Sequence, residues 1–372
     1  MALPLVSIPG PARDAGHAHG RLTRELFEPA FCEQYVQSLC AINRVERRDM
    51  TSQAERWLSQ LPLHHQEEID GMAAGARVPL IRVTELLYAD IARATDTSDQ
   101  PFDPARPSER PPEPVPNGPM CSAMITPPAR TNSPWIARNC DWLKAILVRG
   151  TSAVHHALPN RIPVLAVGIN GDIDIDTGMN AEGLWLHLHT LYAPGDPKGD
   201  RTRISWLFWA REALELCATL DELERFIEST ERDRGVIAIA ADGKTGETAL
   251  FECSKSDHRR IDGNGDILLA TNHPQHKHPD AERVGRSRPG STIARYGGLR
   301  DLVDRQPPER LPEDLIGVLG HESVEMRTPT HLRTIYSAVA DPATRRIWFA
   351  AGTADGKPAA STGSWESVPM PF

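Results

Sequence analysis

A proline-rich segment divides this sequence into two parts with different hydrophobic periodicities. Residues 100–119 contain eight prolines, and prolines at this density exclude both a helix and a central strand. Before the segment, apolar residues recur at steps of three and four, which is typical of helices. After it, short apolar or alternating runs are separated by glycine-rich turns and predict strands. The change of period predicts an α+β chain.

The part before the proline-rich segment is expected to be mainly helical. In its first periodic stretch, Pro29 predicts a kink. In the last stretch, Thr84 is the predicted N-cap. The predicted helices cover residues 19–42, 51–61, 63–76 and 83–91.

The part after the proline-rich segment is expected to consist of strands with two helices among them. Residues 204–217 carry apolar side chains on one helical side, and Thr219 is the predicted N-cap of the helix that follows. Strands grouped around two helices indicate mostly antiparallel sheets covered by helices. The predicted strands are residues 122–126, 134–138, 164–169, 184–189, 236–240, 248–253, 267–271, 335–340 and 347–351.

The composition limits the partners and the compartment of this protein. A net charge of −9, with no stripe of Lys and Arg along the 372 residues, argues against nucleic acid as a partner. No apolar run is long enough for a membrane helix, and no basic, apolar leader predicts secretion. Six cysteines without a CxxC pair are typical of reduced thiols, so we expect a cytoplasmic protein. We expect no cofactor, and the sequence leaves open whether the chain forms a homo-oligomer.

Cys121 is the first candidate for chemistry, because it opens a predicted strand directly after the proline-rich segment. A free thiol has a pKa of about 8.5 and needs a base or a positive charge to become a nucleophile. An α-amino group, with a pKa of about 7.7–8.0, supplies that base on the same residue once the bond between Met120 and Cys121 is cut. A buried structural cysteine is the alternative interpretation.

Three further motifs resemble those of a known enzyme family. Arg138-Asn139-Cys140-Asp141 follows on the next predicted strand, Thr271-Asn272-His273 ends a later strand, and Ser291-Thr292-Ile293-Ala294-Arg295-Tyr296 begins a helix. In their order and spacing they resemble the acyl-CoA:6-aminopenicillanic acid (isopenicillin N) acyltransferase family of N-terminal-nucleophile hydrolases. The resemblance implies a four-layer αββα sandwich. It also implies a helical prosegment (1–99), a linker (100–120) that ends at the scissile Met120–Cys121 bond, and a catalytic domain (121–372).

The resemblance also implies roles for individual residues. Cys121 attacks an amide carbonyl, Arg138 stabilises the thiolate, and Asp141 orients the new α-amino group. Asn272 donates a hydrogen bond to the oxyanion, and Arg295 orders the catalytic network. Taken alone, the same residues could be a surface ion pair, a turn asparagine and a surface arginine on a helix. The residues expected to contact the substrate are Asn139, Asn180 and Ser291.

The function that follows from the resemblance is hydrolysis of a small-molecule amide, or transfer of its acyl group, through a Cys121 thioester. The chain would first cleave itself, and its two fragments would stay associated. Hydrolysis of β-alanyl amides or N-acyl amino acids, as in carcinine hydrolases, is an alternative. Relatives usually carry glycine where this chain has Met120, and glycine adopts strained backbone geometry more easily. A member of the fold that neither cleaves itself nor catalyses is therefore the second alternative.

Histidines provide a rival interpretation, a metal site. His273, His276 and His278 with Asp280 form one candidate cluster, and His187 with His189 forms another. The first cluster is interrupted by prolines and a lysine, unlike ligand sets held on rigid elements. The sequence therefore favours a site without metal.

Overall fold

The structure of the chain is a computed structural model that describes residues 3–43, 45–92, 120–191, 203–274, 292–327 and 332–372. The proline-rich segment and Ser291 lie outside them. Within the described stretches, no helix combines the length and the apolar character needed to cross a membrane.

Helices dominate the part of the chain before the proline-rich segment, and strands dominate the part after it. The first part contains β1 (Leu5–Pro9), α1 (Ala12–Leu22), the 3-10 helix η1 (Arg24–Phe27), α2 (Pro29–Asn43), α3 (Arg47–Gln60), α4 (Leu63–Ala76) and α5 (Leu80–Ala89). The strands of the second part are β2 (Met120–Thr126), β3 (Trp135–Leu143), β4 (Thr151–Ala157), β5 (Val164–Ile169), β6 (Thr177–Asn180), β7 (Leu184–Thr190), β8 (Val236–Asp242), β9 (Thr248–Cys253), β10 (His258–Asp262), β11 (Leu268–Ala270), β12 (Leu332–Asp341), β13 (Arg346–Ala351) and β14 (Glu366–Val368). Its helices are α6 (Pro128–Thr131), the 3-10 helix η2 (Lys144–Arg149), α7 (Trp206–Leu216), α8 (Leu220–Ser229), α9 (Thr292–Arg305), α10 (Glu313–Leu319) and α11 (Ala359–Thr362).

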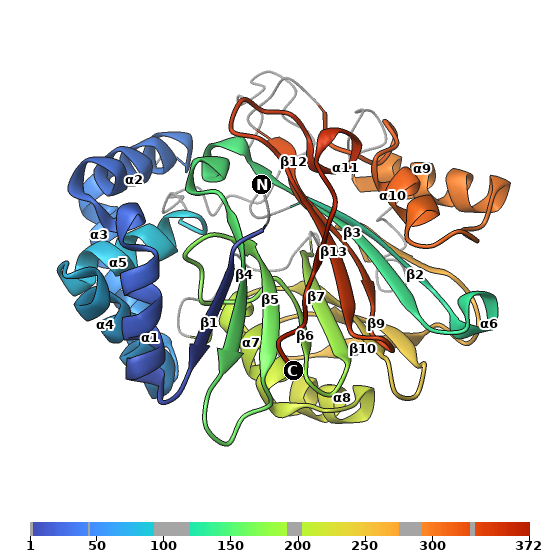
Figure 1. Cartoon of the computed structure of the whole chain (residues 1–372), viewed down its shortest axis with the longest axis horizontal. Coiled ribbons are helices and arrows are strands. Elements are labelled where there is room, and N and C mark those ends of the chain that lie inside the picture. The colour runs from blue at the N-terminus through green and yellow to red at the C-terminus, as the bar shows by residue number, and fades with distance from the viewer. Residues whose placement is uncertain (1–2, 44, 93–119, 192–202, 275–291, 328–331) are drawn as a thin grey trace, which may run out of the picture.

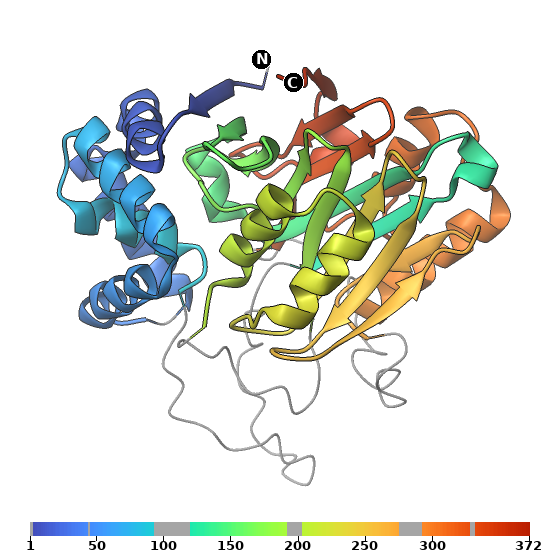
Figure 2. The same ribbon diagram turned by 90° about the horizontal axis from the view of Figure 1, so that it is seen from below.

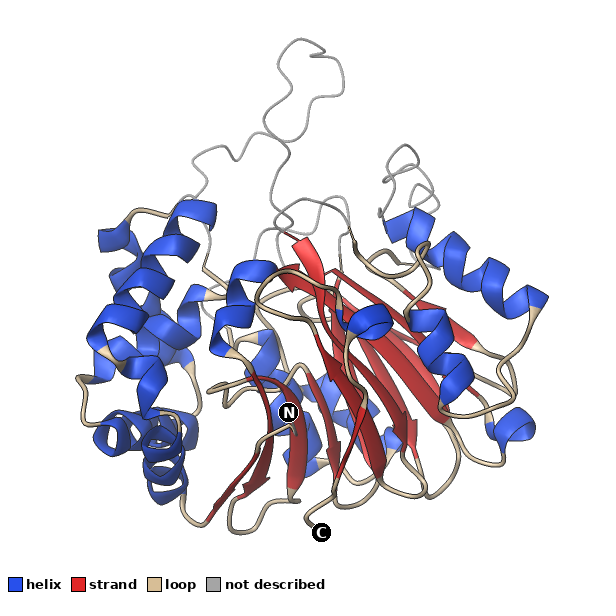
Figure 3. Cartoon of the chain, turned by 45° about the horizontal axis from the view of Figure 1, so that its top comes forward, coloured by secondary structure: helices blue, strands red, loops and turns tan. Residues whose placement is uncertain are grey.

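Two sheets that face each other form the centre of the molecule (Figure 1, Figure 3). Sheet A has the strand order β1-β4-β5-β6-β7-β8-β9-β10, and sheet B has the order β11-β2-β3-β12-β13-β14. The neighbouring strands are antiparallel except for β1 and β4. Helices α7 and α8 cover the outer face of sheet A (Figure 2), and α9, α10 and α11 cover the outer face of sheet B. The predicted α+β fold with four αββα layers is confirmed.

The two faces of sheet B bury different sets of side chains. In β2, Ile125 belongs to the core between the sheets, whereas Met124 packs against α9 and α10. Successive side chains of a strand point to opposite faces, so Cys121 lies on the inter-sheet face with Ile125. In β3, the same alternation places Arg138 on the inter-sheet face and Asp141 on the helix-covered face.

The N-terminal region joins this sandwich through a strand and a closely packed pair of helices. Strand β1 pairs in parallel with β4 and so becomes the edge of sheet A. Helices α1 and α4 cross where both carry glycine. A Cβ atom at Gly16 would lie 1.9 Å from the carbonyl oxygen of Glu68, and one at Gly71 would lie 2.1 Å from that of Arg13. Neither position can hold a larger residue without moving the helices apart.

Most of the predicted elements are present, with differences at their ends. Helix α4 has the predicted bounds, and Pro29 interrupts the first predicted helix by starting α2. Thr219 caps α8, since its hydroxyl accepts a hydrogen bond from the first turn. The prediction that Thr84 is an N-cap was wrong, because α5 begins at Leu80 and the Thr84 hydroxyl donates to the Leu80 carbonyl. Strand β3 is longer than predicted, so the Arg-Asn-x-Asp motif lies inside it.

Candidate active site

Cys121 lies near the start of β2, an interior strand of sheet B flanked by β11 and β3. The register of the β2–β3 pair places Cys121 opposite Cys140 and Met120 opposite Asp141. The Cys121 thiol is completely buried, and its Sγ lies 3.9 Å from the carbonyl oxygen of Leu188 in sheet A. The sulfur therefore lies between the two sheets.

Arg138 provides a positive charge beside this sulfur. Its Nη2 lies 3.3 Å from Cys121 Sγ and 3.1 Å from Asp176 Oδ2, while its Nη1 donates to Thr177 Oγ1 at 2.5 Å. Burial opposes the charge, but the attraction of Asp176 raises the pKa of Arg138 well above its usual value. The ring of Tyr336 lies 5.2 Å from the guanidinium. A fixed cation at this distance stabilises a thiolate relative to a thiol.

Cys140 faces the same space but does not share this contact. Its Sγ lies 3.5 Å from Asp176 Oδ2. Burial and the neighbouring Cys121 raise the pKa of the Cys140 thiol well above its usual value. The Cys140 thiol is therefore harder to ionise than a free thiol.

Asn272 holds the backbone nitrogen of Cys121. It follows β11, which pairs with β2, so it lies beside the start of that strand. Its Oδ1 accepts a hydrogen bond from Cys121 N at 2.8 Å, and its Nδ2 donates to Thr190 O at 2.8 Å. The structure thus brings Asn272 to the site, as predicted, but places it at the nitrogen of the nucleophile. The predicted contact was with an oxyanion.

Arg295 connects the backbone of Cys121 to Asn272 and Asp141 from the helix-covered face. From α9, its Nη1 donates to the carbonyl oxygen of Cys121 and, at 2.7 Å, to Ser122 Oγ. Its Nη2 donates to Asn272 Oδ1 at 2.9 Å, and Nη1 lies 3.5 Å from Asp141 Oδ2. The predicted ordering role of Arg295 is consistent with these contacts.

Asp141 is completely buried and has one carboxylate oxygen without a hydrogen bond. Oδ1 accepts from Thr334 Oγ1 at 2.5 Å, whereas Oδ2 has no hydrogen-bond partner among the described residues. Burial raises the pKa of Asp141 to about 6, against the opposing effects of Arg295 and Thr334. In the continuous chain the Cys121 nitrogen bonds to Asn272, so the predicted contact between Asp141 and an α-amino group is not present in this state.

Two residues predicted to contact the substrate have other contacts. Asn139 faces the outer layer, where it donates to Leu319 O at 2.9 Å and accepts from Ser337 Oγ at 2.7 Å. Asn180 donates to two carbonyl oxygens at the end of α7 and accepts two backbone N–H groups of its own turn. Both are completely buried. These contacts occupy the side-chain amides of both residues, and the substrate contacts predicted for Asn139 and Asn180 stay predictions.

The histidines of the rival metal interpretation have other partners. His187 accepts from Trp185 Nε1 at 2.8 Å, and His189 Nδ1 lies 2.9 Å from Thr271 O. Burial lowers the pKa of both rings well below the usual value. Neither belongs to a group of described residues whose ligand atoms converge on one point. His276, His278 and Asp280 lie outside the described residues.

The sequence interpretation missed the partners that sheet A supplies to Arg138. Asp176 and Thr177 stand at the start of β6, and Tyr336 Oη donates to Asp176 Oδ2 at 2.9 Å. A signal was present, because Asp172, Asp174 and Asp176 alternate with isoleucines. Such alternation places the three carboxyl groups on one face of an extended segment.

Two facing sheets, covered on both sides by helices and with a cysteine at the start of a central strand, define an N-terminal-nucleophile hydrolase. The particular family follows from a family model. The model for acyl-coenzyme A:6-aminopenicillanic acid acyl-transferase matches residues 129–355, so the chain belongs to this family. The match begins after Cys121 and includes Arg138, Asp141, Asn272 and Arg295. The family is named for an acyl-transferase, which supports an enzyme that acts on carbon–nitrogen bonds.

Solved structures with a similar arrangement share little sequence with this chain. A Caenorhabditis elegans ortholog of N-acylethanolamine-hydrolyzing acid amidase is 17% identical, with 67% of this chain and 100% of that chain covered and a TM-score of 0.44. Penicillin V acylase from Agrobacterium tumefaciens is 18% identical, with 67% and 86% covered and a TM-score of 0.44. A mutant conjugated bile acid hydrolase from Clostridium perfringens is 11% identical, with 68% and 97% covered and a TM-score of 0.45. No curated protein sequence matches this chain significantly.

Proposed function

We propose that this protein is a cysteine amidohydrolase or N-acyltransferase that cleaves its own chain before Cys121. The observation that carries the proposal is the pair of contacts made by one residue. The Cys121 sulfur lies 3.3 Å from a buried guanidinium, and its nitrogen is held by a buried amide at 2.8 Å. Residues 1–99 would be the prosegment, 100–120 the linker, and 121–372 the catalytic domain.

Self-cleavage uses the same sulfur as catalysis. Cys121 Sγ attacks the carbonyl carbon of Met120, the C–N bond breaks, and the nitrogen leaves as an amine with the proton of the thiol. Water then hydrolyses the thioester, which releases a carboxylate on Met120 and frees both the thiol and the α-amino group. Asn272 binds the nitrogen of Cys121 and Arg295 binds its carbonyl oxygen. These two contacts hold the backbone of Cys121 in place while the Met120–Cys121 bond reacts.

Turnover then follows from a base and a nucleophile on one residue. The α-amino group takes the thiol proton, Sγ attacks the amide carbonyl of the substrate, and the leaving amine departs with that proton. Water, or an acceptor amine, resolves the thioester.

Asp141 is the proposed partner of the protonated α-amino group. Two observations support this: Asp141 lies opposite Met120 in the ladder, and its Oδ2 has no hydrogen bond from the residues that the structure describes. Cleavage adds N–H donors to the Cys121 nitrogen, and one of them can use this oxygen.

Denaturing mass spectrometry of the purified protein tests the maturation step. We expect a 120-residue fragment and a 252-residue fragment that begins with Cys121, which together make up the 372 residues. Cys121→Ala should remain whole and inactive. Cys140→Ala, which changes the cysteine directly opposite in the ladder, is the matched control and should still cleave. An intact chain in fully active enzyme would sink the maturation scheme.

A further inference from the structure

Two histidines of β7 lie beside the proposed nucleophile, and the proposed reaction uses neither of them. His187 and His189 are completely buried. They share a face of the strand with Trp185, which belongs to the core between the sheets, whereas Leu188 belongs to the core under α7 and α8. The carbonyl oxygen of Leu188, between the two histidines in the sequence, lies 3.9 Å from Cys121 Sγ. The two rings therefore flank the point where sheet A approaches the thiol.

The ring of His187 presents an N–H donor on the Arg138 side of the thiol. In the ladder His187 lies opposite Thr177, whose hydroxyl accepts a hydrogen bond from Arg138. Its Nδ1 lies 2.8 Å from Nε1 of Trp185, and because an indole nitrogen only donates, Nδ1 is the accepting nitrogen. Burial and the charge of Arg138 lower the pKa of His187 well below its usual value, so the ring is neutral and its proton is on Nε2. Within the described part of the chain, this Nε2–H has no acceptor.

The ring of His189 presents an acceptor on the Asn272 side of the thiol. Its Nδ1 lies 2.9 Å from the carbonyl oxygen of Thr271, and because a carbonyl only accepts, Nδ1 carries the proton. Burial and the charge of Arg138 lower the pKa of His189 well below its usual value, so the ring is neutral and Nε2 has a lone pair. No described residue donates to this nitrogen. Thr271 directly precedes Asn272, which binds the nitrogen of Cys121.

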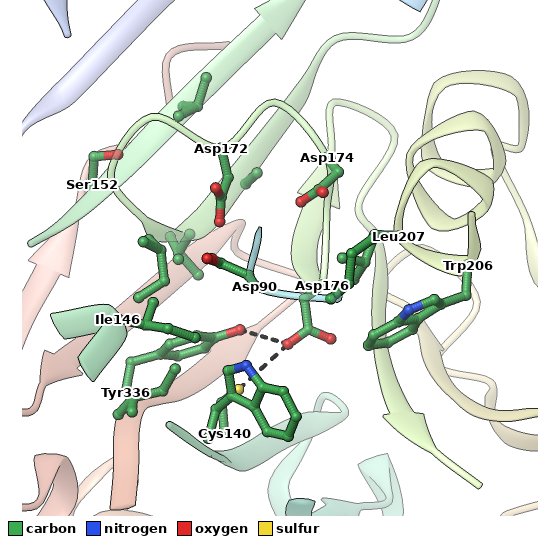
Figure 4. Close-up of a pocket in the computed structure, with 18 residues that line it drawn as sticks. Asp90, Cys140, Ile146, Ser152, Asp172, Asp174, Asp176, Trp206, Leu207 and Tyr336 are labelled. Atoms are coloured by element: carbon green, nitrogen blue, oxygen red, sulfur yellow. Dashed lines mark hydrogen bonds between the residues drawn. The ribbon is translucent and has the colours of Figure 1, made fainter. Parts of the chain in front are cut away.

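An amide group matches these two rings. The ring centroids of His187 and His189 lie 5.2 Å apart, so one small group can contact both. The carboxylate oxygen that pairs with Arg138 is occupied, since Asp176 Oδ2 also accepts from Tyr336 (Figure 4). Buried polar atoms without partners are rare in folded proteins, so a donor and an acceptor on neighbouring rings point to a ligand that offers both complements. The C=O of an amide accepts and its N–H donates.

We propose that His187 and His189 bind the scissile amide of the substrate. His187 Nε2–H donates to the carbonyl oxygen, and His189 Nε2 accepts the N–H of the leaving nitrogen. The inference rests on the proposed function, because it places the amide carbon at Cys121 Sγ. His187 thereby supplies the oxyanion donor that the sequence had assigned to Asn272, whose Nδ2 donates to Thr190 O.

The two histidines contribute at different stages of the reaction. When Cys121 Sγ attacks, the carbonyl oxygen gains negative charge, so the hydrogen bond from His187 becomes stronger in the transition state and raises kcat. The N–H is already present in the bound substrate, so its hydrogen bond to His189 favours amides over esters, which lack it. A histidine with a lowered pKa accepts this hydrogen bond without removing the proton.

Butyranilide and phenyl butyrate, which differ in the N–H, test these roles on the wild-type protein as purified. His187→Leu should lower kcat for both probes by about 10²–10³-fold with little change in KM, and His187→Gln, which keeps an N–H donor, should recover part of it. His189→Leu should lower kcat/KM about 10- to 100-fold for the anilide and leave the ester unaffected. His156→Leu, at a buried histidine of β4, is the matched control and should keep the ratio of the two kcat/KM values. An unchanged kcat in His187→Leu, or equal losses on both probes in His189→Leu, overturns the inference.

Nitrogen-15 NMR of labelled histidines separates this inference from the proposed function. The free protein should show a proton on Nε2 of His187 and on Nδ1 of His189, with the signals assigned from the His187→Gln and His189→Gln proteins. Butyramide should shift both Nε2 signals, methyl butyrate only that of His187, and butyrate, the product of hydrolysis, serves as the control ligand. These shifts support the inference even where neither butyranilide nor phenyl butyrate is hydrolysed, an outcome that counts against the function alone. The opposite tautomers, or no shift with butyramide, overturn the inference and leave the amidase assignment standing.

Discussion

Asp141→Asn should stabilise the protein at neutral pH. Burial raises the pKa of this carboxyl from its ordinary 3.8 to about 6. Between about pH 4 and pH 6 the folded chain therefore keeps a proton that the unfolded chain has released, so the free energy of unfolding falls as the pH rises. One pKa unit corresponds to about 1.36 kcal/mol, so ionised Asp141 destabilises the fold by roughly 3 kcal/mol at pH 7. The attraction of Arg295 is already contained in that pKa.

Urea unfolding measures this difference directly. The background is Cys121→Ala, which keeps one uncleaved chain, and the free energy of unfolding is compared at about pH 4 and pH 7. The free energy of unfolding of the Asp141→Asn protein is compared with that of its parent at each pH. From the lower to the higher pH, this difference should change by roughly 3 kcal/mol in favour of the variant. Asp301→Asn, which removes an exposed carboxylate from α9, is the control. Parallel stability profiles for variant and parent would refute the reasoning.

The same substitution should reduce activity in the otherwise wild-type chain. The protonated α-amino group loses its proposed anionic partner, so both self-cleavage and kcat should fall, and the acidic limb of the remaining pH–rate profile should move to lower pH. A gain in stability together with a loss of function is expected where a buried charge is kept for chemistry. A more stable variant with full activity would assign Asp141 a purely structural role.

Two further predictions follow from the contacts of Cys121 and of β1. Asn272→Ala should lower kcat by up to about 10²-fold, the loss that a misplaced reacting group can cause, because the amide oxygen that holds the nitrogen of Cys121 is removed. A folded Asn272→Ala protein with near-normal kcat would remove Asn272 from the site. After cleavage, the fragments should co-elute on size exclusion and separate only in denaturant, because five residues of β1 pair with β4 of the other fragment. Elution of the large fragment alone under native conditions would contradict this.

Local patterns were enough to predict the elements around the nucleophile. The β2–β3 pair is formed by neighbouring strands, and both were predicted from their own apolar runs. The distant residues Asn272 and Arg295 were found through the resemblance, because nothing in their own surroundings distinguishes them from a turn asparagine and a surface arginine.

The missed features depend on contacts between distant parts of the chain. Strand β1 was not predicted, because an edge strand of five residues with alternate exposed positions gives a weak signal and is set by its pairing with β4. Asp176 approaches Arg138 only because sheets A and B face each other. The orientation of Asn139 also depends on the length of its strand. Strand β3 continues through residues 138 to 140, so the side chains of these residues alternate between its two faces. Arg138 and Cys140 face the space between the sheets, and Asn139 therefore faces the helix-covered side.

The two arginines of the site act on Cys121 from opposite faces of sheet B. Arg138 contacts the sulfur from the inter-sheet face and is paired with Asp176, at 3.1 Å. Arg295 contacts the backbone of Cys121 from the helix-covered face and lies 3.5 Å from Asp141. The side chain of one strand residue lies on one face of the sheet only. The contacts to the Cys121 sulfur and the contacts to the Cys121 backbone are therefore made from different faces. The inter-sheet pair of Arg138 and Asp176 contacts the sulfur, whereas Arg295, with Asp141 beside it, contacts the backbone of Cys121.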